Sequence, residues 1–374
     1  MAPSISLSYC PSDEEAERFW QAELQNGKVS TGVPDGFPQK LRSSFAWKGA
    51  DIEDKQSEWQ LDLTSDEIDS VNAALAAFEA KHTDLSDISA SSFALPAPLI
   101  QRLRGVSDDL YDGLGFQIIH GLDPTKYTPR QNIIIFAGVS AHICPERGFS
   151  DQGREEVISK SSISFHTDNC EIIAFHYLDT AIEGGDTLLT SSWQVYNDLA
   201  KTRPDVLNTL TQPWWFDSFK AYDAHPPRHI VPLQKVDDDK IHLRLSRYRV
   251  IGWQRKRNPN LPAPTQAQLE ALDAVQFTAM KNAITLRAVR GDLLFVNDMV
   301  LMHAREKFDE GGIFMKRHLV KLYLRDPEKD WHIPPSLEEE RRETYGSNRP
   351  DGLKKEVWHV IYVPGIEEHK RENG

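Results

Sequence analysis

The sequence is poor in cysteine and has no long apolar run. Its three cysteines, Cys10, Cys144 and Cys170, are odd in number and far apart, which argues against a disulfide framework and indicates a reducing compartment. No run of about 18 or more apolar residues occurs, and the first residues lack the basic region and apolar core of a secretory signal. We therefore predict a cytoplasmic protein without a membrane span.

An excess of positive charge is also absent. The chain of 374 residues carries a formal net charge of −13, which opposes nonspecific attraction to nucleic acid and to anionic membranes. One basic cluster stands out, from Arg244 to Arg257, and we interpret it as solvated or as facing a small anionic ligand. We therefore expect a small-molecule partner, and the oligomeric state is left open.

The apolar pattern changes along the chain from helical to strand-like. Thr64 and Glu67 form a capping-box pattern before an amphipathic run to Lys81, and Thr128-Pro129 is typical of a helix start. Further on, short apolar segments bounded by turn residues predict strands. The expected helices cover residues 67–81, 96–106, 131–142, 192–200 and 265–283, and the expected strands cover 113–122, 163–165, 171–178, 187–190, 229–233, 240–250, 284–287, 292–297 and 317–324.

No internal repeat or low-complexity linker divides the helical part from the strand-rich part. We therefore predict one mostly β domain with additional helices, built on a barrel-like or jelly-roll sheet. Residues 1–109 would form an N-terminal extension and helices packed on the core. Residues 110–335 would form the core with its insertions, and residues 336–374 would form a charged, irregular tail of the same domain.

A histidine and a carboxylate lie two residues apart in Phe165-His166-Thr167-Asp168, where a predicted strand runs into a turn. Residues i and i+2 of a strand face the same side, so His166 and Asp168 can reach one metal ion. His303 is the best candidate for a third ligand. Two histidines and one carboxylate form the facial triad of non-haem Fe(II) oxygenases. Spacing alone is a weak signal, because His82-Thr83-Asp84 repeats it at an expected helix end.

Four motifs in a fixed order make the signal specific, and together they resemble the TauD/TfdA-like Fe(II)/2-oxoglutarate dioxygenases and the related clavaminate-synthase-like proteins, particularly the fungal members. The resemblance covers roughly residues 110–335. The motifs are Phe165 to Asp168, Glu183-Gly184-Gly185-Asp186-Thr187-Leu188-Leu189, Gly291 to Asn297 leading to His303, and Arg317 to Asp326.

The resemblance implies a double-stranded β-helix fold and Fe(II) bound by His166, Asp168 and His303. It also implies that Arg317, fourteen residues beyond His303, binds the tail carboxylate of 2-oxoglutarate with help from Thr187. A guanidinium offers a carboxylate two parallel donors, and a hydroxyl adds a third, which supports this pairing on chemical grounds. The implied cosubstrates are 2-oxoglutarate and O2.

Several residues compete for these roles. Arg305 and Arg325 are alternatives to Arg317, although Arg325 adjoins Asp326 and is expected to form a surface pair. The alternatives to His303 fall in a variable insertion: His225, His229 and His242. Cys170 is expected to be a small buried residue beside the site, and His318 is expected to face the opposite side of its strand from Arg317.

The implied reaction couples decarboxylation of 2-oxoglutarate to hydroxylation, desaturation or cyclisation of a small organic molecule of amino-acid or secondary-metabolite type. A carboxylate on this substrate is expected from the cations near the predicted mouth, which are Arg305, Lys316, Lys321 and Arg244 or Arg247. Specificity is expected in the loops 143–160, 212–228 and 246–264. The alternative functions are a catalytically silent binding module on the same fold and a cupin-like metal hydrolase or isomerase.

Overall fold

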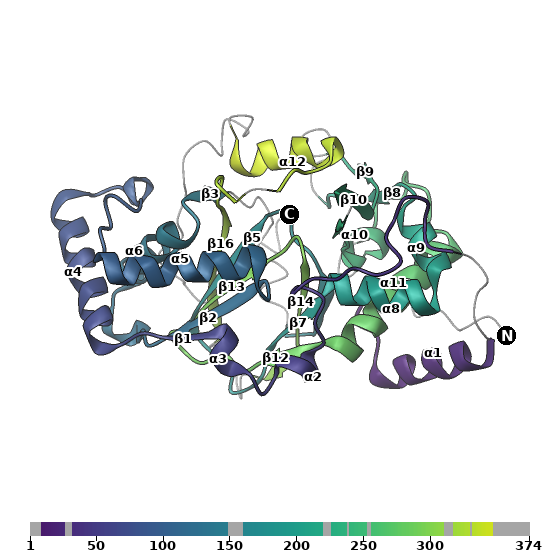
Figure 1. Cartoon of the computed structure of the whole chain (residues 1–374), viewed down its shortest axis with the longest axis horizontal. Coiled ribbons are helices and arrows are strands. Elements are labelled where there is room, and N and C mark those ends of the chain that lie inside the picture. Colours follow the sequence, from purple (N-terminus) through teal and green to yellow (C-terminus); the bar gives the residue numbers. More distant parts are fainter. Residues whose placement is uncertain are drawn as a thin grey trace.

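A computed structural model describes residues 9–26, 32–148, 160–219, 226–237, 239–252, 256–309, 317–329 and 331–346. Two sheets lie at its centre, and helices gather on either side of them (Figure 1). The six-stranded sheet has the order β1 (Gln60–Asp62), β2 (Phe116–His120), β13 (Leu293–Asn297), β5 (Ile172–Asp179), β16 (His318–Arg325) and β3 (Glu146–Gly148). The four-stranded sheet has the order β12 (Ile284–Leu286), β7 (Thr187–Ser191), β14 (Leu301–Arg305) and β4 (Ile163–His166).

The strands of both sheets are antiparallel except for the parallel pair β1 and β2. This arrangement is the predicted jelly-roll, or double-stranded β-helix, core. Short two-stranded ribbons extend it: β6 (Glu183–Gly184) with β15 (Phe308–Asp309), β8 (Trp214–Phe216) with β9 (Arg228–Ile230), and β10 (Leu233–Asp237) with β11 (Lys240–Leu243).

Alternating side chains of the central strands belong to two different apolar clusters. Leu293 and Phe295 of β13 join the helices on the outer face of the six-stranded sheet. Leu294 and Val296, the alternate residues, join the cluster that includes Leu189 of the four-stranded sheet. Because strand side chains alternate between faces, β13 is buried on both sides, and this explains its unbroken apolar sequence.

Capping boxes begin three of the long helices, and each was visible in the sequence as a threonine followed three residues later by Glu or Gln. These helices are α4 (Ser65–Lys81), α6 (Pro129–Ile143) and α11 (Gln266–Asn282). Helix α5 (Ala97–Asp112) packs with α6 beside the six-stranded sheet, and α8 (Ser192–Thr202), α9 (Pro204–Leu210) and α11 pack together beside the four-stranded sheet (Figure 1).

The remaining elements are α1 (Asp13–Asn26), α2 (Gly49–Ile52), α3 (Gln56–Trp59), α10 (Arg247–Ile251), α12 (Pro335–Tyr345) and the 3-10 helices η1 (Leu85–Asp87) and η2 (Pro124–Lys126). None of the helices in the described ranges is both long enough and apolar enough to cross a membrane.

Two local predictions were wrong. The strand expected over residues 240–250 ends at Leu243, and α10 follows it, because Arg247 turns inward to pair with Asp273 of α11 at 2.7 Å. The tail expected to be irregular contains α12, whose Glu340 is buried against Arg244. In both cases the deciding partner is distant in the sequence, so a local pattern could not reveal it.

Candidate metal centre

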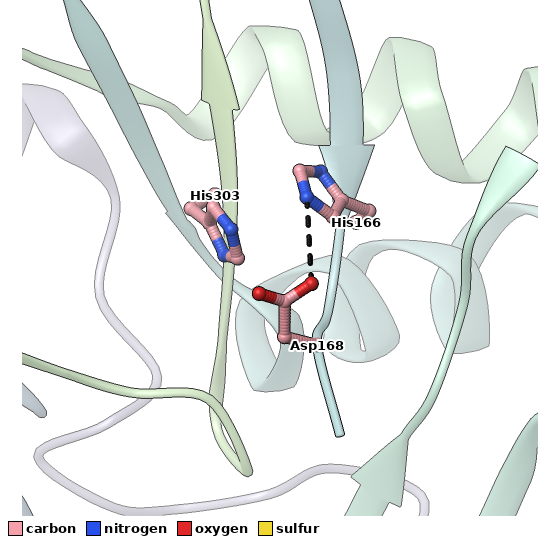
Figure 2. A group of neighbouring side chains, drawn as sticks. All are labelled: His166, Asp168 and His303. Carbon is pink, nitrogen blue, oxygen red and sulfur yellow. Dashed lines mark ion pairs between the residues drawn. The ribbon is translucent and has the colours of Figure 1, made fainter. Parts of the chain in front are cut away.

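Strand pairing brings together the three residues expected to bind metal. His166 is the last residue of β4, Asp168 follows two residues later, and His303 lies at the centre of β14. Strands β4 and β14 are antiparallel neighbours in which His303 directly faces His166, and the two imidazole centroids are 4.2 Å apart. One ligand atom from each of the three residues lies within 4.8 Å of the others. Figure 2 shows the three side chains turned towards one shared space.

Hydrogen bonds orient the ligand atoms of the first strand. Nδ1 of His166 lies 2.9 Å from the carbonyl oxygen of Ser164, which selects the tautomer with its proton on Nδ1. Nε2 of His166 then faces Oδ1 of Asp168 at 3.9 Å (Figure 2). The other oxygen, Oδ2 of Asp168, accepts hydrogen bonds from Lys321 and Tyr323, each at 2.9 Å. Lys321 and Tyr323 therefore hold the carboxylate so that Oδ1 is presented on the side of the histidines.

The ionisation states of the candidate ligands favour a bound cation. Burial alone would raise the pKa of the Asp168 carboxyl, but the Lys321 ammonium, followed by His303 and His166, holds that pKa well below its usual value. Burial lowers the pKa of His303 to about 4, so its imidazole is neutral near pH 7. An ionised carboxylate beside neutral imidazole nitrogens is the donor set that a divalent metal requires. The residues therefore fit the expected ion.

A second carboxylate lies beneath these ligands. Asp298 is fully buried, and burial raises its pKa, with the neighbouring Asp168 carboxylate raising it further. One of its oxygens accepts the backbone N–H of Asp168 at 2.5 Å, and the other lies 3.2 Å from Nδ1 of His303. Sequence reasoning missed Asp298, because it lies in the turn before β14 and no periodic pattern marks it.

The two residues expected to bind 2-oxoglutarate line the same cavity of about 120 Å³ as the metal triad. Thr187 begins β7, and its hydroxyl is 2.6 Å from the hydroxyl of Tyr177. Arg317 directly precedes β16 and lies over the ring of Phe308, with 5.5 Å between the guanidinium carbon and the ring centroid. The structure thus brings all five predicted residues to one cavity.

A glycine turn makes room for Arg317. Gly185 has a φ of +78°, a backbone conformation that L side chains rarely adopt. A Cβ atom at this position would lie 3.1 Å from Nε of Arg317 and 3.1 Å from Cβ of Phe308. Gly184, with a φ of +69°, would place its Cβ only 2.4 Å from the carbonyl oxygen of Lys307. The motif therefore needs both glycines on steric grounds.

The competing arginines occupy different places. Arg305 lines the cavity, stacks on Phe308 at 4.9 Å and donates a hydrogen bond to the Ser161 carbonyl at 2.6 Å. Arg325 lies outside the cavity lining and pairs with Glu146 at 3.3 Å and with Glu171 at 3.2 Å. Arg305 is thus a neighbour of Arg317 at the site, whereas Arg325 is not.

The competing histidines do not line the cavity that holds the triad. His229 stacks on the exposed Trp215 at 4.6 Å, and His242 and Cys170 line an adjoining cavity under α12 that shares Asp168 with the first. His82 pairs with Asp87 at 3.3 Å, and Asp84 caps η1, as expected for that second His-x-Asp. The cavity of the triad does not include His318, while His225 and Lys316 lie outside the described residues.

The interpretation of the basic cluster as solvated was wrong for Arg244 and Arg247. Arg244 and Arg247 are only 5% and 2% exposed, and they pair with Glu340 and Asp273. Neither residue lines the cavity that contains all three triad residues, whereas Arg244 lines the adjoining cavity that shares Asp168. Their acidic partners come from distant helices and could not be recognised from the local charge pattern.

Comparison with known proteins gives consistent matches. The sequence model of the family described as "Taurine catabolism dioxygenase TauD, TfdA family" matches residues 81–323. The chain is 30% identical over 356 residues to the taurine hydroxylase-like protein SAT17 of Stachybotrys chartarum, covering 87% of this chain and 90% of that protein. It is 22% identical over 259 residues to the FR-33289 synthase of Streptomyces rubellomurinus, covering 63% of this chain and 75% of that protein.

Solved structures share the fold at low sequence identity. An asparagine oxygenase in complex with Fe(II), 3-hydroxyasparagine and succinate superposes with a TM-score of 0.55 at 16% identity, covering 75% of this chain and 98% of that one. The non-haem iron oxygenase OrfP in complex with Fe and alpha-ketoglutaric acid superposes with a TM-score of 0.52 at 16% identity, covering 71% of this chain and 94% of that one.

Proposed function

Because this chain belongs to the taurine catabolism dioxygenase TauD, TfdA family, we propose that His166, Asp168 and His303 hold its Fe(II), and that Arg317 and Thr187 bind the tail carboxylate of 2-oxoglutarate. The chain is an Fe(II)/2-oxoglutarate-dependent dioxygenase that oxidises a small organic molecule. The observation that carries the residue assignment is the convergence of these five side chains on one cavity.

Each residue has a definite task in this proposal. Iron held by these residues would supply, with 2-oxoglutarate and O2, the oxidising chemistry that is coupled to decarboxylation of 2-oxoglutarate. His166 and His303 offer nitrogen lone pairs, and Asp168 offers one oxygen because Lys321 and Tyr323 hold the other. The remaining positions of a facial triad stay open for small molecules.

The proposed cosubstrate pocket uses the guanidinium of Arg317 and the hydroxyl of Thr187. The guanidinium of Arg317 presents parallel donors to a carboxylate, which is stronger and more directional than a single neutral donor. Thr187 lines the cavity, and a contact of 2.6 Å with the Tyr177 hydroxyl fixes the position of its own hydroxyl. Burial of the pocket strengthens these interactions, because water competes less for the same donors.

For the substrate we propose a small molecule that carries a carboxylate, of amino-acid or secondary-metabolite type. Three cations line the described part of the cavity, namely Arg305, Arg317 and Lys321, whereas Asp168 is the single carboxylate there. With Fe(II) and 2-oxoglutarate bound, the two added positive charges of the metal and the two added negative charges of the cosubstrate would cancel, so the excess of lining cations over Asp168 would persist. This excess of positive charge around the cavity supports an anionic group on the substrate. Hydroxylation, desaturation and cyclisation all begin from the same oxidising centre, and the substrate decides among them.

We propose that residues 1–109, 110–335 and 336–374 form one domain in the cytoplasm, with neither nucleic acid nor membrane as a partner. The pairing of β1 with β2 supports this organisation, since it attaches the N-terminal part to the central sheet. Helix α12 supports it at the other end, because Tyr345 accepts a hydrogen bond from the Glu171 backbone beside the metal loop. The net charge of −13 supports the choice of partners.

The decisive experiment adds Fe(II) and 2-oxoglutarate to metal-free protein without oxygen and records the visible metal-to-ligand charge-transfer band. We expect a band that is lost in His166→Ala and that needs more 2-oxoglutarate in Arg317→Ala. His82→Ala serves as the control, because His82 belongs to the other His-x-Asp, away from the cavity. A band that survives in His166→Ala, or an unchanged 2-oxoglutarate requirement in Arg317→Ala, would contradict the assignments.

A further inference from the structure

One buried carboxylate contacts two of the three proposed metal ligands at once. Asp298 lies in the turn between β13 and β14 and is 0% exposed. Its Oδ2 atom accepts the backbone N–H of Asp168 at 2.5 Å, and its Oδ1 atom lies 3.2 Å from Nδ1 of His303. A single group therefore touches one ligand in the segment after β4 and another in β14.

The backbone around this carboxylate is firmly fixed. The backbone N–H of Asp298 donates to the carbonyl oxygen of Glu171 at 2.8 Å. The side chain of the preceding Asn297 donates to the Leu110 carbonyl at 2.9 Å and accepts the Met299 N–H at 2.9 Å. The turn cannot shift without breaking these bonds, so the position of the carboxylate is set before any metal arrives.

We propose that Asp298 is a positioning residue that fixes the spacing between Asp168 and His303, so that the site is formed in advance for a divalent metal. This inference rests on the proposed function, because it assumes that both residues are metal ligands. A metal held at Nε2 of His303 leaves the proton on Nδ1, and this proton then needs an acceptor. Oδ1 of Asp298 is at the right place, and within the described residues neither atom has a hydrogen-bond partner of its own.

The chemistry of a carboxylate is essential to this role. The backbone N–H of Asp168 and the Nδ1–H of metal-bound His303 are both donors, so the group between them must accept twice. Asparagine at position 298 would have nearly the same shape but only one acceptor, and its NH2 group would face one of the two donors. Asp298→Asn therefore tests the double acceptor while changing the volume very little.

The chain offers a closely matched control at the other end of the same strand. Asp292, just before β13, is also buried, accepts the Val289 N–H at 2.6 Å and lies 2.6 Å from Nδ1 of His120. It thus makes the same pair of contacts, to a backbone N–H and to an imidazole, away from the metal triad. Asp292→Asn should cost a similar amount of stability without touching the site.

The test is a titration of metal-free protein with Co(II), followed by calorimetry and by the visible absorption of the bound ion. We expect Asp298→Asn to bind Co(II) on the order of 10- to 100-fold more weakly than the native protein. Asp292→Asn should bind within about threefold of the native protein. Equal affinity of Asp298→Asn and native protein, or an equal loss in both variants, would overturn the inference. Failure of the native protein to bind would instead count against the proposed function.

A measurement on the native protein covers the case in which Asp298→Asn does not fold. With Zn(II) bound, the Nδ1–H proton of His303 should give a low-field NMR resonance that exchanges slowly with water, because it is buried against Oδ1. A resonance that exchanges as fast as that of an exposed imidazole would overturn the inference, whatever the behaviour of the variants.

Discussion

Removal of the Lys321 ammonium group beside Asp168 should lower the stability of the metal-free protein and increase the stabilisation that added metal provides. Lys321 lies 2.9 Å from Oδ2 of Asp168, which is 5% exposed at its side chain, whereas that of Lys321 is 29% exposed. Lys321→Met keeps the length and apolar character of the side chain but removes the charge. Among the described residues, Asp168 would then keep Tyr323 as the side-chain donor on this oxygen.

The size of the effect follows from the contact. At this separation and an effective dielectric constant of about 20, the attraction is on the order of 6 kcal/mol. Desolvation of both groups offsets most of it, and hydrogen bonds to charged groups contribute about 1.5–3 kcal/mol net. Because Lys321 is partly exposed and Tyr323 remains, we expect a loss of about 2 kcal/mol. For a chain of this size, that loss corresponds to a decrease in Tm of about 2–3 °C.

Thermal unfolding in EDTA and then in excess Co(II) measures both parts of this prediction. A divalent cation beside Asp168 replaces the lost charge, so Co(II) should stabilise Lys321→Met more than the native protein and narrow the gap in Tm. Lys329→Met is the control, since Lys329 pairs with the exposed Asp108 and should change Tm by less than about 1 °C. An unchanged Tm in EDTA, or a smaller response to Co(II), would refute the reasoning.

Three further predictions concern the glycine turn, a buried histidine and α12. Gly185→Ala should raise the concentration of 2-oxoglutarate needed for the charge-transfer band by about tenfold, or about 1.4 kcal/mol, whereas Gly36→Ala, with a φ of +79° and no atom within 4 Å of its Cβ, should leave it unchanged. His176 is buried, and burial lowers its pKa to about 3, below the unfolded value, so stability should fall as the pH drops below about 6.5. His176→Phe should remove this part of the pH dependence of the free energy of unfolding, as measured with denaturant. Relative to the native protein, the variant should be about 2 kcal/mol more stable at pH 5 than at pH 8, and an unchanged pH dependence would contradict the prediction. Arg244→Met removes one partner of the buried Glu340, which keeps its ion pair with Arg228 at 2.7 Å, and should cost about 1.5–3 kcal/mol in the same assay, while the double variant with Glu340→Met should recover part of that loss.

The residues expected to bind metal could be predicted from the sequence, whereas the contacts that depend on tertiary packing could not. His166, Asp168 and His303 were recognisable because a metal needs specific donors, and strand periodicity placed the first two on one face. Asp298 was not recognisable, because its role depends on a turn that brings it under both Asp168 and His303. The same reason hid the burial of Arg244, whose partner Glu340 is 96 residues away in α12.

The register of β16 connects the helices of the N-terminal half to the chemistry of the site. Lys321 and Tyr323 face Asp168, while the alternate residues Leu322 and Leu324 pack into the cluster formed with the outer helices. A slip of one residue would turn the two leucines towards the metal and bury Lys321 among the apolar side chains of the helices. The burial of these leucines therefore specifies where the ammonium and the phenol lie. The helical half of the chain supplies none of the proposed ligands, but it determines how one of them, Asp168, is held.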